Sequence, residues 1–142
     1  VLSNLGLLLS EKGDVEGAEP LLRRSLEIKE KVLGPEHPET LNDLQNYGVL
    51  LRDLSRYDEA LIFLKKSDDT HKAVYGANSL ERAYPLSALG QTEFLLKNFK
   101  AAEKYYQKAL KIRESHLDSD DPAVIKIKER LKELDEARNG KS

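Results

Sequence analysis

Apolar residues along this chain recur three and four positions apart, which is the spacing of one face of an α-helix. The first run, Leu2, Leu5 and Leu9, predicts a helix over residues 1–11. The same spacing predicts further helices over about 15–33, 39–54, 57–75, 80–96, 99–117 and 122–138. Valine and isoleucine are sparse beside leucine, alanine, glutamate and lysine, which favours helix over strand. The sequence therefore predicts an all-α fold.

Residues that stop or start helices separate these runs. The predicted breaks lie at 12–14, 34–38, 55–58, 76–78, 97–98 and 118–122. Asp14, Ser55 and Asp121 are predicted helix N-caps, the last of them before Pro122 as the first helical residue. Pro85 requires that its helix begins late or bends in its first turn, because proline lacks the backbone N–H.

Three sets of positions repeat at an interval of 42 residues, and such an interval is typical of a repeat array. The sets are Gly6, Gly48 and Gly90; Ala18, Ala60 and Ala102; and Leu2, Leu44 and Leu86. The interval predicts three helical hairpins over residues 1–37, 38–79 and 80–121, a closing helix over 122–138 and a tail over 139–142, together one domain over 1–138. Lys132 occupies the glycine position in the closing helix, which predicts a face in contact with water.

A glycine in the middle of a helix costs roughly 1 kcal/mol relative to alanine, so its return at one position predicts a packing role. We expect the second helix of each hairpin to press on the first helix at this glycine. The predicted small residues opposite are Ala18, Ala60 and Ala102. The larger residues Leu22, Leu64 and Tyr106 are expected to fill the space between hairpins.

A small residue in helix one, alanine near the start of helix two and large apolar residues at fixed offsets resemble the tetratricopeptide repeat. The 42-residue interval and the stretch 18–40, AEPLLRRSLEIKEKVLGPEHPET, resemble the longer repeats of the kinesin light chain family. The resemblance implies a right-handed superhelix, an α-solenoid of three antiparallel helical hairpins plus a C-terminal capping helix. First helices would line a concave groove that binds a peptide segment of a partner protein.

In kinesin-light-chain-like repeats, asparagines of the first helix contact the peptide backbone, and the matching positions here are Asn4 and Asn46. The third repeat departs from this pattern, because Ala88 stands there. An amide both donates and accepts hydrogen bonds, so it can hold a peptide group. The full set of predicted peptide-binding residues is Ser3, Asn4, Asn42, Gln45, Asn46, Val49, Arg52, Ser87 and Gln91.

Composition limits the other function classes. The net charge is −2 and no cysteine is present, so we expect no nucleic-acid partner, no membrane partner and no cofactor. We also expect a cytoplasmic location. The three histidines lack metal-ligand spacing, and the aspartates at 118–121 lack the glutamate of a calcium loop, so no metal site is predicted. A nucleophile beside a base is also missing, so an enzyme is not expected.

The favoured function is therefore a protein–protein interaction module or scaffold, present as a monomer or weak homo-oligomer. Because the chain starts at Val1 without methionine, we interpret it as part of a longer protein. Two alternatives stay open. The repeats could be a structural or self-associating segment of a longer superhelix, or they could be the regulatory domain of a larger enzyme or sensor.

One exposed stripe could serve a second partner. Lys100, Lys104, Lys108 and Lys111 recur at helical spacing on the predicted helix 99–117. They could dock an acidic protein, but Glu103 and Glu114 lie among them, which favours a solvated face.

A local weakness is predicted in the second hairpin. Asp68 and Thr70 occupy positions where the first and third repeats carry leucine and isoleucine. Either the second hairpin packs less tightly there, or Lys72 or His71, one turn farther on, meets the charge of Asp68. Our hypothesis is a weak seam between the second and third repeats, so we expect backbone amides of residues 64–74 to exchange with solvent faster than those of 22–32. Hydrogen exchange measured by mass spectrometry tests this, and equal protection of the two segments would contradict it.

Overall fold

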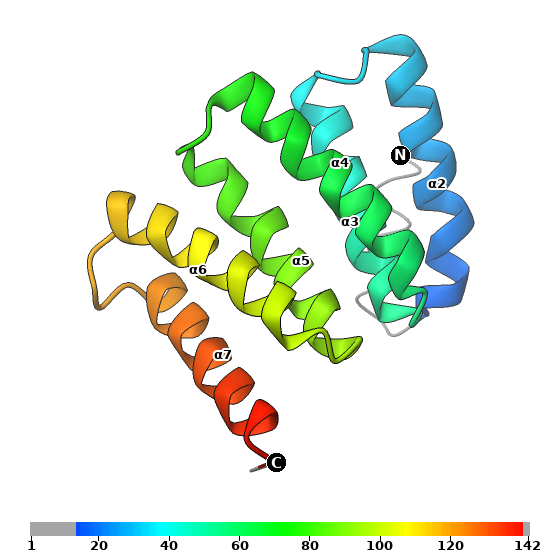
Figure 1. The fold of residues 1–142 in the computed structure, drawn as a ribbon. Helices are drawn as coiled ribbons and strands as arrows, with labels where there is room; N and C mark the ends of the chain where they lie inside the picture. The colour runs from blue at the N-terminus through cyan, green and yellow to red at the C-terminus, as the bar shows by residue number, and fades with distance from the viewer. Residues whose placement is uncertain (1–13, 141–142) are drawn as a thin grey trace. The chain divides into compact units, whose positions relative to one another are not determined.

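The computed structural model describes residues 14–140, and it divides the chain into two compact units, residues 1–70 and 71–142. The first unit contains α2 (Val15–Val32), α3 (Pro38–Asp53) and most of α4 (Tyr57–Tyr75). The second contains the end of α4, a 3-10 turn η1 (Leu80–Arg82), α5 (Ala83–Leu95), α6 (Phe99–His116) and α7 (Pro122–Arg138). All regular elements in the described part are helical, as predicted (Figure 1). The predicted helix over 1–11 lies outside the described residues.

Two of the predicted N-caps are confirmed. The Asp14 side chain accepts a hydrogen bond from the backbone N–H of Gly17 at 2.9 Å. Asp121 accepts from the N–H of Ala123 at 2.9 Å, and Pro122 is the first residue of α7. Pro85 is the third residue of α5, which follows the 3-10 turn η1, so the late start that this proline required is present.

The prediction that Ser55 caps α4 is wrong. Ser55 has a positive φ of 62° and belongs to the turn that ends α3. The N–H of Arg56 bonds to the carbonyl of Leu51 at 2.9 Å, and this closure requires a left-handed residue between them. Lys97, 42 residues later, repeats the geometry with φ 65°. Neither serine nor lysine signals this conformation in a sequence.

The core of the first unit comes from one stripe on each of its helices. The fully buried apolar side chains of these stripes are Ala18 and Leu22 on α2, Leu41, Leu44 and Leu51 on α3, and Ala60 and Leu64 on α4. The ring of Tyr47 meets that of Phe63 edge-on, with centroids 4.9 Å apart. On α2 and α3 this burial gives each helix one apolar face toward the core.

In the second unit, α6 packs against both α5 and α7 (Figure 1). Its core is formed by buried residues of α5, α6 and α7. They are Ala83, Leu86, Ala102, Tyr106, Ala109, Ile112, Ile127 and Leu134. The sequence pattern of α7 suggests Ile125, Leu131 and Leu134 as its inward residues, but Ile125 is 43% exposed, and Val124 and Ile127 are buried instead. The spacing of Val124, Ile127, Leu131 and Leu134 makes one regular stripe, and Ile125 lies a quarter turn away from it. Lys132 is exposed, as predicted.

The repeated glycines pack against a different set of residues from the predicted one. A Cβ on Gly48 would lie 2.7 Å from Cδ2 of Leu64, and one on Gly90 would lie 2.6 Å from the ring of Tyr106. The contact is therefore with the residue one turn after Ala60 and Ala102. These alanines are fully buried, but the larger side chains touch the glycines.

A buried carboxylate also links α2 to α3 and to the turn before α4. Glu19 on α2 is 7% exposed, and its Oε1 accepts a hydrogen bond from the hydroxyl of Tyr47 at 3.0 Å. Guanidinium nitrogens of Arg23 and Arg56 lie 3.4 Å from the same oxygen. Burial, and then the bond to Glu19, raise the pKa of Tyr47 to about 12.

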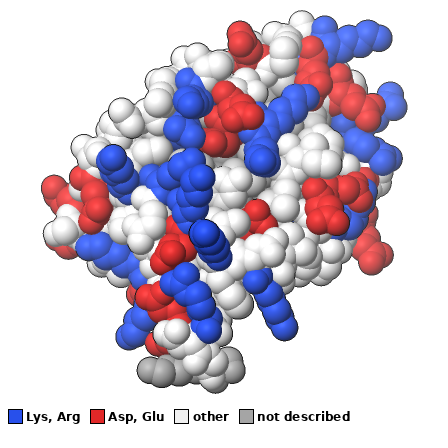
Figure 2. All heavy atoms as spheres, in the orientation of Figure 1, with Lys and Arg blue, Asp and Glu red and all other residues white. Residues whose placement is uncertain are grey.

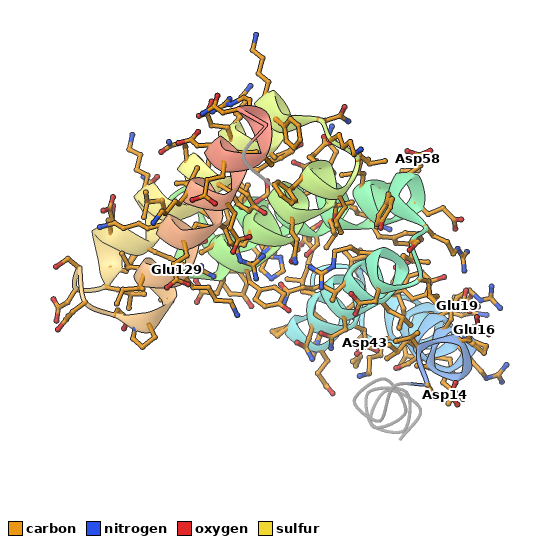
Figure 3. All side chains as sticks on the ribbon, turned by 90° about the horizontal axis from the view of Figure 1, so that it is seen from below. Asp14, Glu16, Glu19, Asp43, Asp58 and Glu129 are labelled. Atoms are coloured by element: carbon orange, nitrogen blue, oxygen red, sulfur yellow. The ribbon has the colours of Figure 1, made fainter. Side chains whose placement is uncertain are left out.

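A second buried carboxylate lies nearby. Asp43 on α3 is fully buried and accepts a hydrogen bond from the hydroxyl of Ser25 on α2. The ammonium of Lys29 lies 3.3 Å from the same oxygen of Asp43. Glu19 lies near the start of α2, whereas Asp43 contacts Ser25 and Lys29 farther along that helix, so each carboxylate fixes the pair at its own point. Figure 3 labels both carboxylates.

The substitution Gly48→Ala tests the close contact with α4. Alanine gains about 1 kcal/mol of helix propensity, but its Cβ would overlap the fully buried Leu64, and overpacking costs about 1–3 kcal/mol. We expect a net loss of about 1 kcal/mol in the free energy of unfolding, measured by urea denaturation. In a Leu64→Ala background the same substitution is expected to stabilise the protein. An equal effect in both backgrounds would show that Leu64 is not the constraint.

The substitution Tyr47→Phe tests the buried carboxylate. At neutral pH, loss of the hydrogen bond to Glu19 is expected to cost about 1–2 kcal/mol. Between pH 10 and 12 the folded wild type keeps a phenolic proton that the unfolded chain has released. Its stability therefore falls by roughly 2–3 kcal/mol as pH rises through this window.

The phenylalanine variant lacks this loss, so the stability advantage of the wild type should disappear between pH 10 and 12 and reverse near pH 12, where the variant becomes the more stable protein. Urea denaturation at a series of pH values measures the difference. A difference that stays constant with pH would contradict the assigned bond.

Candidate peptide-binding surface

The predicted site residues on α3 share one face of that helix. They are Asn42, Gln45, Asn46, Val49 and Arg52, at intervals of three and four residues. Asn42 is exposed and the other four are half-buried. The other side of α3 carries the buried Leu41, Leu44 and Leu51, so the amphipathic pattern of the helix places the polar side chains outside the core.

The amides of this face have no hydrogen-bond partner within residues 14–140. This holds for Asn42, Gln45 and Asn46, whereas the guanidinium of Arg52 donates to Asp53 Oδ1 at 3.1 and 3.3 Å. An unpaired amide offers both a donor and an acceptor. The three amides therefore expose groups that suit hydrogen bonding to a peptide, and Val49 adds an apolar side chain about one turn after Gln45 and Asn46.

The other predicted residues lie elsewhere. Ser3 and Asn4 are outside the described residues. Ser87 and Gln91 belong to α5 in the second unit. The hydroxyl oxygen of Ser87 is buried and has no partner among the described residues, so it would contact a ligand only after a change of rotamer. Gln91 is half-buried and borders a hollow.

That hollow lies between α5, α6 and α7 and has a volume of about 290 Å³. Its apolar part comes from Phe94, Leu95 and Tyr106. Its charged part is contributed by α7, with Lys126, Glu129, Arg130 and Glu133. Apart from Gln91, no lining residue was predicted from the sequence. The signal that could have found them is the alternation of two basic and two acidic residues at helical spacing on α7.

A partly buried arginine joins α6 to the start of α7. Arg113 on α6 donates a hydrogen bond to the carbonyl of Ala123 at 3.2 Å. Burial lowers the pKa of Arg113, the positive charge of Arg130 lowers it further, and Asp121 opposes the change. The contact therefore helps to fix α7 against α6.

The histidines and the acidic groups take structural contacts. His37 Nδ1 accepts from the N–H of Glu39 at 3.1 Å, so this histidine caps the start of α3. His116 Nε2 lies 2.7 Å from the carbonyl oxygen of Asn78. Across residues 14–140, His, Asp and Glu form no group of three that could hold a metal ion. In the same part of the chain, no helix has the length and apolar character needed to cross a membrane.

Comparison with curated proteins finds relatives that contain this region as a part. The human tetratricopeptide repeat protein 19, mitochondrial, is 29% identical over 117 residues, which are 82% of this chain and 30% of that protein. A clustered mitochondria protein homolog of Coccidioides immitis is 27% identical over 136 residues, 94% of this chain and 11% of that protein. The chain thus spans less than a third of these relatives.

Solved structures show the same fold. A chain described as nearly identical kinesin-light-chain TPR-like repeats from Podosopora anserina matches with a TM-score of 0.87 and 19% identity, over 99% of this chain and 66% of that one. BtubC from P. vanneervenii matches with a TM-score of 0.78 and 17% identity, over 98% and 63%. These likenesses confirm the predicted α-solenoid fold of stacked helix pairs.

The tetratricopeptide repeat family model matches residues 1–69 and 69–115, which are most of the chain. This match agrees with the resemblance found in the 42-residue interval and in residues 18–40. The chain belongs to the tetratricopeptide repeat family.

Proposed function

We propose that this chain binds an extended peptide segment of a partner protein through the amide-bearing face of α3. Tetratricopeptide repeats generally mediate protein–protein interactions, and this supports a non-enzymatic binding role. The observation that carries the proposal is the set of amides at Asn42, Gln45 and Asn46, which lie at helical spacing without partners within residues 14–140. Three such groups on one face match the repeat of donors and acceptors along a peptide backbone.

Each amide would form hydrogen bonds with one peptide group of the ligand, and Val49, about one turn farther along α3, would contact an apolar side chain of the ligand. The backbone supplies the same groups in every sequence, so these contacts alone give affinity with little selectivity. We expect a modest affinity for a single short peptide, because ordering the ligand opposes the gain from a few hydrogen bonds.

The cytoplasmic location predicted from the sequence stays a prediction. The human relative is named mitochondrial, and that name describes the relative. Fluorescence microscopy of the tagged full-length protein would decide between the two compartments.

The substitution Asn46→Ala tests the binding face. A peptide-library screen with this chain would first supply a ligand, and isothermal titration calorimetry would then measure its affinity. Removal of one amide is expected to weaken binding by about 1 kcal/mol, close to fivefold. The double variant Asn42→Ala/Asn46→Ala should lose roughly twice that free energy, because both amides are outside the core.

Gln107→Ala is the matched control, since Gln107 is an exposed amide in the middle of α6. It should bind the peptide as the wild type does. All variants should keep the wild-type circular dichroism and urea midpoint within error. If the double variant binds the selected peptide with unchanged affinity, the α3 face is not the binding surface.

A further inference from the structure

The outward face of α6 carries an uncompensated row of positive charge. Lys100, Lys104, Lys108 and Lys111 are all exposed, and they recur at intervals of four, four and three residues. They lie on the side of α6 opposite the buried Ala102 and Ala109. With a rise of 1.5 Å per residue, the row is about 16 Å long. No ion pair joins any of these four lysines to an acidic residue within 14–140.

The glutamates that lie among the lysines in sequence are held by α7. Glu103 pairs with the guanidinium of Arg138 at 3.0 Å, and Glu114 lies 3.7 Å from the ammonium of Lys128. The hydrogen bonds from Arg138 lower the pKa of Glu103, so this carboxylate stays negatively charged and is paired with Arg138. The sequence favoured a solvated face because these glutamates lie among the lysines. Their pairing with α7 removes that reason. In Figure 2, Lys and Arg side chains gather over α6 and α7.

An open hollow adjoins the first lysines of the row. It has a volume of about 490 Å³ and is lined by Asn98, Phe99, Lys100, Ala101 and Lys104. Phe99 is half-buried against the core cluster, and Ala101 is small. The surface here can receive an apolar side chain from a partner. It has no protruding apolar group of the kind that inserts into a membrane.

The start of α6 adds to this positive field. The Asn98 side chain does not cap the helix, because its Nδ2 donates to Glu93 Oε1 at 3.0 Å. The first turn of α6 contains no acidic residue. The free N–H groups of an uncapped helix start favour a nearby carboxylate. They therefore act in the same direction as Lys100 and Lys104.

We propose that the lysine face of α6 (Lys100, Lys104, Lys108, Lys111 and the hollow at Phe99 and Ala101) binds an acidic segment of a partner protein. One apolar side chain of that segment would lie in the hollow, and its carboxylates would follow the lysines toward the C-terminal end of α6. This surface is separate from the amide face of α3, so it would allow the chain to hold two protein segments.

The probe for a test is a fluorescently labelled peptide of roughly ten residues, all glutamate except one leucine, and fluorescence anisotropy measures its affinity. The variant Lys104→Glu/Lys108→Glu should bind it at least about tenfold more weakly, because exposed pairs each contribute up to 1 kcal/mol and reversal adds repulsion. Wild-type affinity should fall as salt rises, since exposed charges are screened.

Lys65→Glu/Lys72→Glu is the matched control. Both lysines are exposed on α4, and the change in net charge is identical. This variant should bind the probe as the wild type does. If it loses as much affinity as the α6 variant, net charge alone governs binding and the proposal fails.

Ala101→Glu tests the hollow separately. A glutamate at the third helical position of α6 favours the helix start, so the variant should fold at least as well as the wild type. Its carboxylate would occupy the hollow and repel the probe, and binding should weaken roughly tenfold. The all-glutamate peptide without leucine should bind the wild type several-fold more weakly than the probe. Unchanged binding by Ala101→Glu would overturn the role of the hollow.

Two further results would overturn the proposal as a whole. One is equal binding of the probe by the wild type and by Lys104→Glu/Lys108→Glu. The other is stronger retention on vesicles that contain anionic lipid than on the acidic peptide, which would assign the face to a membrane. Asn42→Ala/Asn46→Ala should leave probe binding unchanged, so a failure of the α3 proposal and a failure of this one are distinguishable.

Discussion

The close approach of two helices at a glycine is the constraint on which this structure depends. Gly48 on α3 leaves room for the side chain of Leu64 on α4, and Gly90 on α5 leaves room for the ring of Tyr106 on α6. A Cβ at either glycine would overlap its neighbour. Because the larger side chain fills the notch, the two helices of a hairpin lie close enough to share one core. The helix propensity lost at glycine is offset by this burial.

The same close packing decides which side chains are available for binding. On α3 the leucines and Gly48 face the core, and the amides of Asn42 and Asn46 are therefore turned outward. On α6 the buried alanines and Tyr106 occupy one side, so the lysines lie on the other. Each candidate binding surface is thus the outward side of a helix whose opposite side packs into the core. This link explains how a structural repeat can present a different polar face on each helix.

Two buried charged residues contribute to the interior of the first unit. Glu19 and Asp43 are buried carboxylates, and each has a hydroxyl donor and at least one cation within 3.4 Å. A buried charge is tolerated only when such partners are present. Both carboxylates join α2 to α3, so they specify how these helices align where leucine contacts alone would permit sliding. The sequence suggested neither role, since a glutamate and an aspartate in amphipathic helices usually face water.

By itself the sequence determined the helices, their breaks and the 42-residue interval, because helix periodicity and turn residues act between neighbours a few positions apart. It also pointed to the tetratricopeptide repeat family. Only the tertiary structure decided that Leu64 and Tyr106, and not the alanines, touch the glycines, and that Ile125 faces outward. The tertiary structure alone also decided the left-handed turns at Ser55 and Lys97 and the pairing of Glu103 with Arg138. Each depends on residues or backbone closures that a local pattern does not record, since the distance between side chains 35 positions apart is set by how helices pack.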